Sequence, residues 1–391
     1  MSVSFMRPVY NSKPIGSVDS LARALLLSTQ QLKTLAGSAT SHYREFDIPK
    51  RDGSFRKVAG PTQELKTVQR RINRQIFENV SFPPYLYGSI KDRNYIHNAH
   101  CHARAHVIVA MDVRDFFPSI KRNAVVDIFK HFFHFSDAVA QVLADLCTRN
   151  GELPQGACTS SYIANLALYD IEHRFVNNLR YEGLTYSRLI DDISISSTRP
   201  LSARRIQSLV EQVAEMLKCH GFAPKRRKTK VASRENPHTP MEVTGLQLNL
   251  GQPRVKGDDR AKIRTAVRKC IRLAKFDRTS KEFHDLHNQT SGKVAMLAQL
   301  KHVEAKRYRK VLRLAAPLYS PSEIAKTEKI VNSICRVTLG KRDNVSYIER
   351  YYQARYRVNI VSRTNASLAA ELHAKLGRHA PTCTKDEAIY G

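Results

Sequence analysis

The sequence predicts an α+β protein, and three features of the chain support this fold class. Strand-like and helix-like segments alternate from residue 106 to residue 250. After Gly257 the pattern is helical and very basic up to about residue 315. The sequence PLYSPS then interrupts this pattern, and a second, mostly helical stretch runs to the end. We therefore place boundaries near residues 255 and 320.

Two elements are predicted ahead of the mixed region. Residues 18–37 carry apolar positions at helical spacing and stop at Gly37, as one capped amphipathic helix would. The sequence IPKRDGSFRKVAGP predicts a hairpin that turns at Asp52-Gly53, with a basic helix after it. The hairpin carries Lys50, Arg51, Arg56 and Lys57. A charged hairpin is often only a solvated surface, so this feature alone assigns no function.

Composition indicates a polyanionic partner. The chain has 391 residues, with 64 Lys and Arg against 35 Asp and Glu, so its formal net charge is +29 at pH 7. Nucleic acid is the first expectation, because no stretch approaches the ~18 apolar residues of a membrane-spanning helix and the start lacks an apolar signal core. The seven cysteines include no Cys-x-x-Cys pair. We therefore expect a soluble, cytoplasmic protein without disulfides or a membrane partner.

Two adjacent carboxylates, Asp191 and Asp192, lie inside the apolar alternating stretch SRLIDDISIS. The alternation predicts two short strands that meet at a tight turn, with the aspartates at its tip. Asp is also a common turn residue, so an isolated pair would carry little information. A function for both carboxylates requires a third one and a divalent metal.

A third carboxylate, Asp112, follows the apolar run of residues 107–111. The run predicts a buried strand that delivers Asp112 at its end. Two-metal phosphoryl transfer needs carboxylates from separate elements that hold two Mg²⁺ ions about 3.5–4 Å apart. Asp112 and Asp191 would bridge both ions, and Asp192 would support them.

Between these segments, GELPQGACTSSYIANLALYDIEHRF predicts a turn followed by a helix. Pro154 and Gly156 form the turn, and Gln155 lies at its exposed crest. Thr159 or Ser160 is expected to cap the helix. Taken alone, this is an ordinary capped helix.

Three motifs, in this order, resemble the palm motifs of reverse transcriptases: Asp112-x-x-x-Phe-Phe, Leu153-Pro-Gln-Gly-Ala and Ile190-Asp-Asp. Three ordered motifs are far more specific than any one of them. The resemblance spans about residues 18–315 and implies a right-hand polymerase with an antiparallel palm sheet and a helical thumb. It implies an N-terminal helix and fingers over 1–105, a palm with interleaved fingers elements over 106–255, a thumb over 256–318 and a C-terminal helical extension over 319–391.

Two further stretches are similar to signatures of retron reverse transcriptases. These signatures are Asn98-Ala99-x-x-His102 in HNAHCHARAH and Val243-Thr244-Gly245 in PMEVTGLQLN. The resemblance implies that both regions help to recognise a cognate structured non-coding RNA. It also implies priming from a guanosine 2′-hydroxyl, a branched single-stranded DNA product, an RNA–DNA hybrid partner and a part in anti-phage defence. An accessory effector protein would be a further partner of such an enzyme.

The same resemblance assigns roles around the incoming dNTP. Lys50 and Arg56 would hold the triphosphate, where the planar fork of an arginine suits phosphate recognition. Gln155 would touch the sugar and the base, and Phe117 would leave no room for a 2′-hydroxyl. Lys228, in a loop after the aspartate pair, would protonate the leaving pyrophosphate. The basic helices from 258 to 315 would grip the duplex backbone.

Zinc binding is a competing interpretation of HNAHCHARAH, because five of its residues are of ligand type: His97, His100, Cys101, His102 and His106. No second Cys/His pair with matching spacing lies nearby, which disfavours zinc. His102 is then expected to be either an RNA contact or a satisfied structural histidine.

The motifs depart from the usual pattern at Leu189, which replaces a Tyr, and at Cys158 and Ser161, which replace prolines. These changes concern primer placement and remove no metal ligand. Two other functions stay open: a catalytically idle RNA-binding relative, and a reverse transcriptase of the group II intron or another phage-defence type. The three aspartates argue against the first alternative, and the two retron-like signatures argue against the second.

Overall fold

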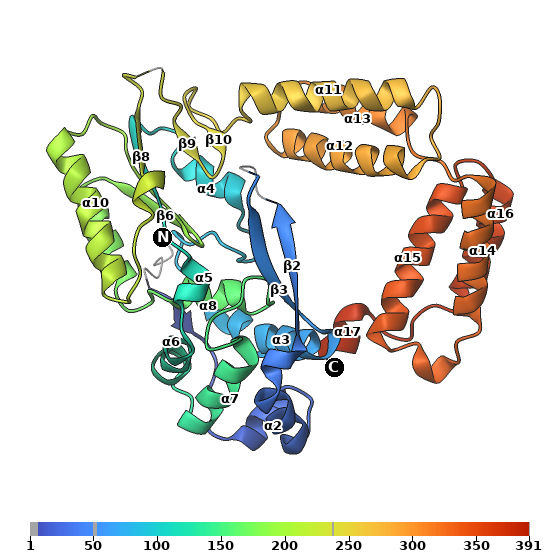
Figure 1. Ribbon diagram of the computed structural model, residues 1–391, viewed down its shortest axis with the longest axis horizontal. Helices are drawn as coiled ribbons and strands as arrows, with labels where there is room; N and C mark the ends of the chain where they lie inside the picture. The colour runs from blue at the N-terminus through green and yellow to red at the C-terminus, as the bar shows by residue number, and fades with distance from the viewer. Residues whose placement is uncertain (1–6, 50–52, 237, 391) are drawn as a thin grey trace. The chain divides into compact units, whose positions relative to one another are not determined.

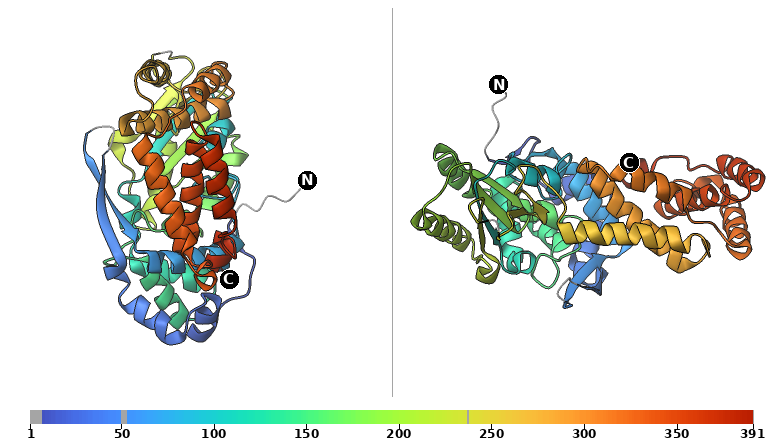
Figure 2. Two further views of the ribbon diagram at one scale, coloured as in Figure 1. Left: turned by 90° about the vertical axis from the view of Figure 1, so that its right-hand side faces the viewer. Right: turned by 90° about the horizontal axis from the view of Figure 1, so that it is seen from above.

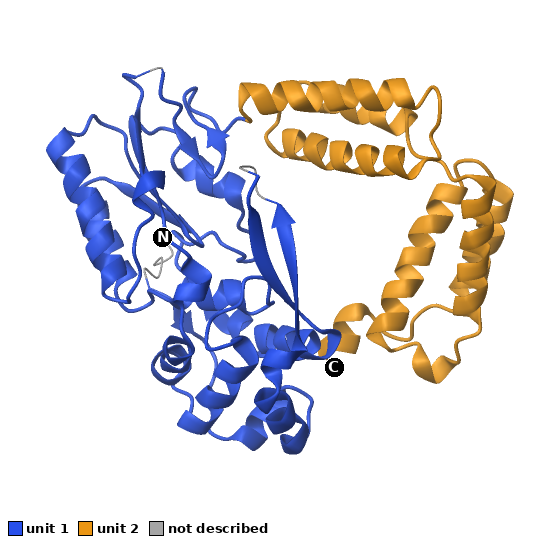
Figure 3. Cartoon of the chain, viewed as in Figure 1, with its two compact units in different colours: residues 1–254 blue, residues 255–391 orange. Residues whose placement is uncertain are grey.

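The computed structural model describes residues 7–49, 53–236 and 238–390. The chain divides between Arg254 and Val255 into two compact units (Figure 3). Unit 1 combines helices with a four-stranded sheet and smaller two-stranded sheets, whereas unit 2 is helical. The mixed composition confirms the predicted α+β class. None of the helices in the described ranges combines the length and the apolar character needed to span a membrane.

Unit 1 begins with strand β1 (Val9–Tyr10), which pairs with β4 (Val80–Ser81), and with two helices, α1 (Val18–Ala24) and α2 (Thr29–Gly37). The prediction of one helix over residues 18–37 is wrong. Leu26 has a φ of +55°, which ends the first helix. Ser28 then starts the second through a capping box with Gln31.

The predicted basic hairpin is present as strands β2 (Tyr43–Pro49) and β3 (Phe55–Pro61), which pair in antiparallel register. Figure 2 shows this long hairpin at the edge of unit 1. Residues 50–52 lie outside the described residues, so Lys50 and Arg51 are not placed. The helix expected after the hairpin is α3 (Gln63–Gln75).

The central sheet has the strand order β6-β7-β5-β8, and all of its pairs are antiparallel. Figure 1 labels two of its strands, β6 and β8. Its strands are β5 (Val107–Asp112), β6 (Thr185–Leu189), β7 (Asp192–Ser197) and β8 (Lys230–Ser233). Because side chains alternate along a strand, Met111 and Ile193 point to one face, where they join a core shared with α8, α9 and α10. The opposite face carries Asp112 and Asp192. Both the predicted buried strand and the predicted hairpin are confirmed.

The remaining elements of unit 1 surround this sheet. They are η1 (Ala39–His42), η2 (Phe77–Asn79), α4 (Tyr95–Cys101), α5 (Phe116–Ser119), α6 (Arg122–Asp127), the π-helical η3 (Ile128–Phe132), α7 (Asp137–Cys147), α8 (Ser160–Leu166), α9 (Glu172–Tyr181), α10 (Ala203–Lys218), η4 (Arg226–Lys228), β9 (Glu242–Val243) and β10 (Leu246–Gln247). The start of α8 differs from the prediction. Thr159 makes no side-chain capping bond, and the Ser160 hydroxyl donates instead to the carbonyl of Pro154 at 2.6 Å.

Unit 2 consists of two helical groups separated at the predicted break. The first group is α11 (Gly257–Leu273), α12 (Lys281–Gln299) and α13 (Ala305–Leu314); the second is α14 (Pro321–Cys335), η5 (Leu339–Lys341), α15 (Val345–Val361), α16 (Ala366–Gly377) and α17 (Lys385–Tyr390). The second group has its own apolar core, which includes Val331, Tyr351 and Leu372. The two helical stretches and the break between them are confirmed.

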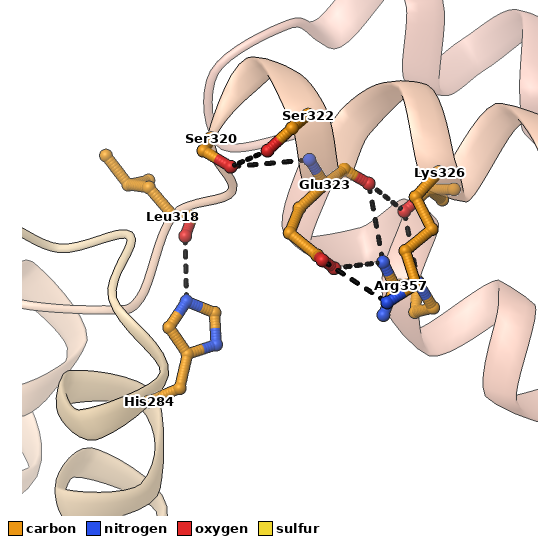
Figure 4. Close-up of polar contacts among 8 residues, drawn as sticks. His284, Leu318, Ser320, Ser322, Glu323, Lys326 and Arg357 are labelled. Atoms are coloured by element: carbon orange, nitrogen blue, oxygen red, sulfur yellow. Dashed lines mark hydrogen bonds and ion pairs between the residues drawn. The ribbon is translucent and has the colours of Figure 1, made fainter.

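The segment between these groups is fixed by polar contacts (Figure 4). The His284 ring donates from Nε2 to the carbonyl of Leu318 at 2.7 Å and stacks on the ring of Tyr319. The guanidinium of Arg357 lies 4.7 Å from the centre of that ring and donates to Glu323 Oε2 at 2.6 Å. The break in the helical pattern is therefore an ordered joint within unit 2.

Candidate active site

The pairing of two strands brings the predicted carboxylates together. Asp112, the last residue of β5, lies opposite Asp192, the first residue of β7. Asp191 occupies the preceding turn, where its carbonyl accepts a hydrogen bond from the Val113 amide at 3.0 Å. Three carboxylates from two elements thus lie at one end of the central sheet.

The surroundings of these aspartates disfavour negative charge. Burial raises the pKa of Asp191, and the charge of Asp112 raises it further. Burial, followed by the charges of Asp191 and Asp112, raises the pKa of Asp192 to about 6. Cations placed beside the cluster would therefore stabilise the ionised form of its carboxylates at neutral pH.

Lys228 supplies one such cation. Its Nζ donates to Asp112 Oδ2 at 2.5 Å, and this hydrogen bond raises the pKa of Lys228. In the part of the chain that the structure describes, no three His, Cys, Asp or Glu side chains gather as metal ligands do. The donor set nevertheless fits Mg²⁺, because a hard cation prefers carboxylate oxygens. The backbone brings three carboxylates together, while the side chain of Asp112 is bonded to an ammonium.

A cavity of about 410 Å³ lies beside this cluster. Its lining includes Asp112, Asp192, Leu189 and Lys228 from the end of the sheet that carries the aspartates, and Tyr95, Glu242, Thr244 and Gly245 from the other side. The cavity therefore joins the carboxylates to the turn that carries the second retron-like signature.

The second signature contacts the helix that carries the first. Thr244 and Gly245 form the two-residue turn between β9 and β10, with φ angles of +48° and +83°. The Thr244 hydroxyl donates to the carbonyl of Tyr95 in α4 at 3.1 Å. Helix α4 carries Asn98, so both signatures belong to one local structure.

Three signature residues are buried in this structure, and their expected RNA contacts stay predictions. Asn98, His102 and Val243 are each at most 1% exposed. The ring nitrogens of His102 lie 2.7 Å from the hydroxyls of Ser187 and Ser196, so neither nitrogen is available to RNA or to zinc. Of the two expectations for His102, the structure supports the satisfied structural histidine. Thr244 and Gly245 remain as accessible residues of the signatures.

The turn that carries Gln155 packs on the β2–β3 hairpin. The carbonyl of Gln155 accepts a hydrogen bond from the Ala59 amide of β3 at 2.8 Å. Gly156 has a φ of +119°, and a Cβ there would lie 2.6 Å from Val58 Cγ1, so only glycine allows this close approach. Arg56 is exposed on the same strand and its charge lowers the pKa of Asp191. Arg56 therefore lies within electrostatic reach of the carboxylate cluster.

The two phenylalanines after Asp112 have different surroundings. Phe116 is 2% exposed and makes an edge contact with Phe222. Phe117 is only partly buried. Phe117 is thus the accessible member of the pair, whereas Phe116 belongs to the core.

Comparison with known proteins identifies the family. The profile described as reverse transcriptase (RNA-dependent DNA polymerase) matches residues 48–248. The retron Se72 reverse transcriptase of Salmonella heidelberg (strain 579083-10) is 34% identical over 372 residues, which cover 95% of this chain and 98% of that protein. The retron Ec48 reverse transcriptase of Escherichia coli is 30% identical, covering 91% of this chain and 90% of its own. This chain belongs to the retron reverse transcriptases.

The enzyme is therefore an RNA-directed DNA polymerase of the right-hand type, as the motif order predicted. Family membership disfavours the group II intron and idle alternatives. Among solved structures, telomerase from Candida tropicalis aligns with 90% of this chain and 67% of its own, with a TM-score of 0.42 and 11% identity. This likeness is too weak to carry an argument.

Sequence reasoning missed two groups of residues that hold the aspartate hairpin. One is the buried ion pair between Arg188 and Glu172, and the other is the pair of serines that bond to His102. A signal for the first was available, because a charged residue inside an apolar alternating strand needs a buried partner. The serine contacts had no comparable signal.

The buried imidazole of His102 predicts a pH dependence of stability. Burial lowers its pKa to about 4. The stabilising contribution is therefore fully present above about pH 6.5 and is lost as pH falls toward 4, by on the order of 3 kcal/mol. We expect His102→Gln to lower the free energy of unfolding at pH 7 and to flatten its decline toward pH 4, as measured by urea denaturation.

The exposed His131 provides the control for this measurement. His131→Gln should leave the pH dependence of the unfolding free energy close to that of the wild type. Equal slopes for His102→Gln and the wild type would contradict the assignment of a buried, neutral imidazole.

Proposed function

We propose that the enzyme copies a cognate structured non-coding RNA into single-stranded DNA branched from that RNA, primed by a guanosine 2′-hydroxyl. The observation that carries this proposal is the cavity that joins Asp112 and Asp192 to Thr244 and Gly245. An RNA held at the signature turn would place a hydroxyl beside the carboxylates. The similarity to retron enzymes over 95% of the chain supports the same product class.

For catalysis we assign Asp112, Asp191 and Asp192 as the residues that would hold two Mg²⁺ ions. Bound ions would activate the attacking hydroxyl and neutralise the leaving pyrophosphate. The Nζ of Lys228 donates to Asp112 Oδ2 at 2.5 Å, which places this ammonium beside the carboxylates. We therefore assign Lys228 as the general acid for the pyrophosphate.

For dNTP binding we assign Arg56, with Lys50 beyond the described residues, to the triphosphate. The backbone carbonyl of Gln155 bonds to β3, the strand that carries Arg56, so we assign Gln155 to the sugar and the base of the same nucleotide. Phe117 would stack below the sugar and exclude a 2′-hydroxyl, because its ring is accessible while that of Phe116 is not.

The proposal divides the chain into fingers (1–105), palm (106–255), thumb (256–318) and a C-terminal extension (319–391). Support for the thumb comes from a basic cavity of about 920 Å³ on α12 and α13. Its basic lining residues are Lys301, Lys306, Arg307, Arg309, Lys310 and Arg313. Such a surface suits the phosphate backbone of an RNA–DNA hybrid. An anti-phage role and an effector partner rest on the family resemblance alone.

Removing one carboxylate should separate catalysis from RNA binding. We expect Asp191→Asn to reduce DNA synthesis by about 10³-fold or more, because the site loses a charge that holds the metal. RNA affinity should stay near that of the wild type, since the basic surfaces are unchanged. Primer extension with Mg²⁺ and filter binding measure the two quantities.

Asp92→Asn provides a matched control, because it makes the same charge change at an exposed turn residue that already has a positive φ. This variant should polymerise like the wild type. Synthesis by Asp191→Asn at a near wild-type rate would refute the metal assignment.

Shortening Phe117 should relax sugar selection. If its ring forms a steric wall, Phe117→Val should raise rNTP incorporation relative to dNTP incorporation by at least about tenfold on one RNA template. Phe116→Val should instead lower thermal stability, because Phe116 is a core residue. An unchanged ratio in Phe117→Val would remove Phe117 as the gate.

Branched DNA is the product that distinguishes this proposal. Cells that express the protein with the RNA encoded beside its gene should accumulate one short, discrete DNA. RNase should shorten the product and leave the branch nucleotide, and a debranching enzyme should release a free 5′ end. Linear or heterogeneous DNA would refute the branched product and leave the polymerase assignment intact.

Thr244→Val tests the part played by the signature turn, since it keeps the side-chain shape and removes the hydroxyl bonded to Tyr95. Copying of the cognate RNA should fall more than extension of a generic primed template, because structured RNA is recognised by shape. An equal fall on both templates would contradict a recognition role for this turn.

A further inference from the structure

Arg188 occupies an unusual position in the aspartate hairpin. It lies in β6, three residues before Asp191, and is 0% exposed. Its Nε and Nη2 donate to the two carboxylate oxygens of Glu172 in α9, at 2.5 and 2.7 Å. The other three N–H groups donate to the carbonyls of Ala164, Asn165 and Ile190, at 3.2, 3.0 and 3.0 Å. All five donors of the guanidinium are therefore bonded.

Stability alone is a weak reason for such a pair. Removing two charges from water costs several kcal/mol per ion, and well-packed apolar residues often stabilise a fold equally well. Apolar contacts are not directional, whereas the hydrogen bonds of a planar guanidinium hold each acceptor in a defined place. One of those acceptors, the carbonyl of Ile190, belongs to the turn that carries Asp191.

That turn is strained. Ile190 has a φ of +59°, a conformation that is costly for a β-branched residue and persists only where the surroundings impose it. Its side chain packs on Gly88, where an added Cβ would lie 2.2 Å from Ile190 Cδ1. Gly88 is in turn held by its carbonyl, which accepts from Asn165 Nδ2 at 2.7 Å.

These contacts therefore form a continuous network around the turn. Arg188 bonds to the carbonyls of Asn165 and Ile190, Asn165 bonds to Gly88, and Gly88 packs on Ile190. The main chain of Arg188 also exchanges hydrogen bonds with the segment before Gly88, through the carbonyl of Tyr85 and the amide of Tyr87. Both sides of Ile190 are fixed by this network.

We propose that Arg188, paired with Glu172, is a positioning residue that fixes the Ile190 peptide and thereby aims Asp191 and Asp192 at the metal site. Arg188 touches no reacting atom and acts through the backbone of the turn. The inference rests on the proposed role of the three aspartates in holding metal. It adds that the affinity of the site for metal depends on the strained turn and on the guanidinium that holds it.

Arg188→Lys tests this inference, because lysine keeps the charge and cannot satisfy five acceptors in a plane. We expect the Mg²⁺ concentration for half-maximal synthesis to rise about 10- to 100-fold, as for other residues that orient metal ligands. The dissociation constant for Mn²⁺, titrated by electron paramagnetic resonance without substrates, should rise in parallel. Saturating metal should restore a substantial part of kcat, and RNA affinity should be unchanged.

Arg122→Lys is the control for the same substitution, because Arg122 also pairs with a carboxylate, Asp145, in a partly exposed ion pair outside the hairpin. It should change thermal stability without changing the Mg²⁺ or the Mn²⁺ constant.

Gly88→Ala is the second variant: it leaves Arg188 and Glu172 intact and pushes directly on Ile190. It should weaken Mn²⁺ binding in the same way, and it decides the question if Arg188→Lys does not fold.

The outcomes distinguish a failure of the positioning role of Arg188 from a failure of the metal assignment of the aspartates. Folded Arg188→Lys or Gly88→Ala protein with wild-type Mg²⁺ and Mn²⁺ constants would overturn the positioning role. Such a result would leave the metal assignment standing if Asp191→Asn still abolishes synthesis. Unimpaired synthesis by Asp191→Asn would instead refute the assignment on which the inference rests.

Discussion

Repulsion among three carboxylates is the constraint on which the structure around the central sheet depends. The antiparallel register sets Asp112 opposite Asp192, and the adjoining turn adds Asp191. Burial and mutual repulsion raise the pKa of Asp191 and of Asp192. Without bound cations, these carboxylates would be more stable if they moved apart or took up protons, so the fold must hold them in place. Lys228 offsets part of this repulsion at Asp112. The contacts behind the hairpin must supply the rest.

Those contacts are polar and lie on both faces of one short strand. Side chains alternate along β6, so Arg188 meets Glu172 on one face, while Ser187 meets His102 on the other. A slip by one residue would move each group to the wrong face and leave it buried without a partner. The two networks therefore specify the register of the hairpin. The hairpin register sets Leu189 opposite Asp192, and the pairing of β7 with β5 places Asp192 opposite Asp112.

The elements that sequence reasoning predicted well are those set by local pattern. The apolar run ending at Asp112 and the alternation around Asp191 each reflect strand periodicity, which a single segment contains. The break between α1 and α2 was missed because the positive φ of Leu26 leaves no trace in apolar spacing. The sequence left the role of His102 open between an RNA contact and a structural histidine, because its serine partners lie 85 and 94 residues away in the chain. A sequence motif gives the position of a residue in the chain, but it does not show which distant residues that residue contacts in the fold.

Burial of the first signature changes how RNA recognition by this enzyme must be understood. His102 anchors the end of α4 to the central sheet, and the carbonyl of Tyr95 at the start of α4 accepts a hydrogen bond from the hydroxyl of Thr244. Helix α4 therefore connects the sheet that carries the aspartates to the turn beside the cavity. A net charge of +29 strengthens binding to any RNA, but selectivity for a structured RNA needs a defined shape. Under the proposed function, Thr244 and Asp112 lie in a fixed arrangement that only an RNA of matching shape can span. An RNA recognised at Thr244 must therefore also place its priming hydroxyl beside Asp112.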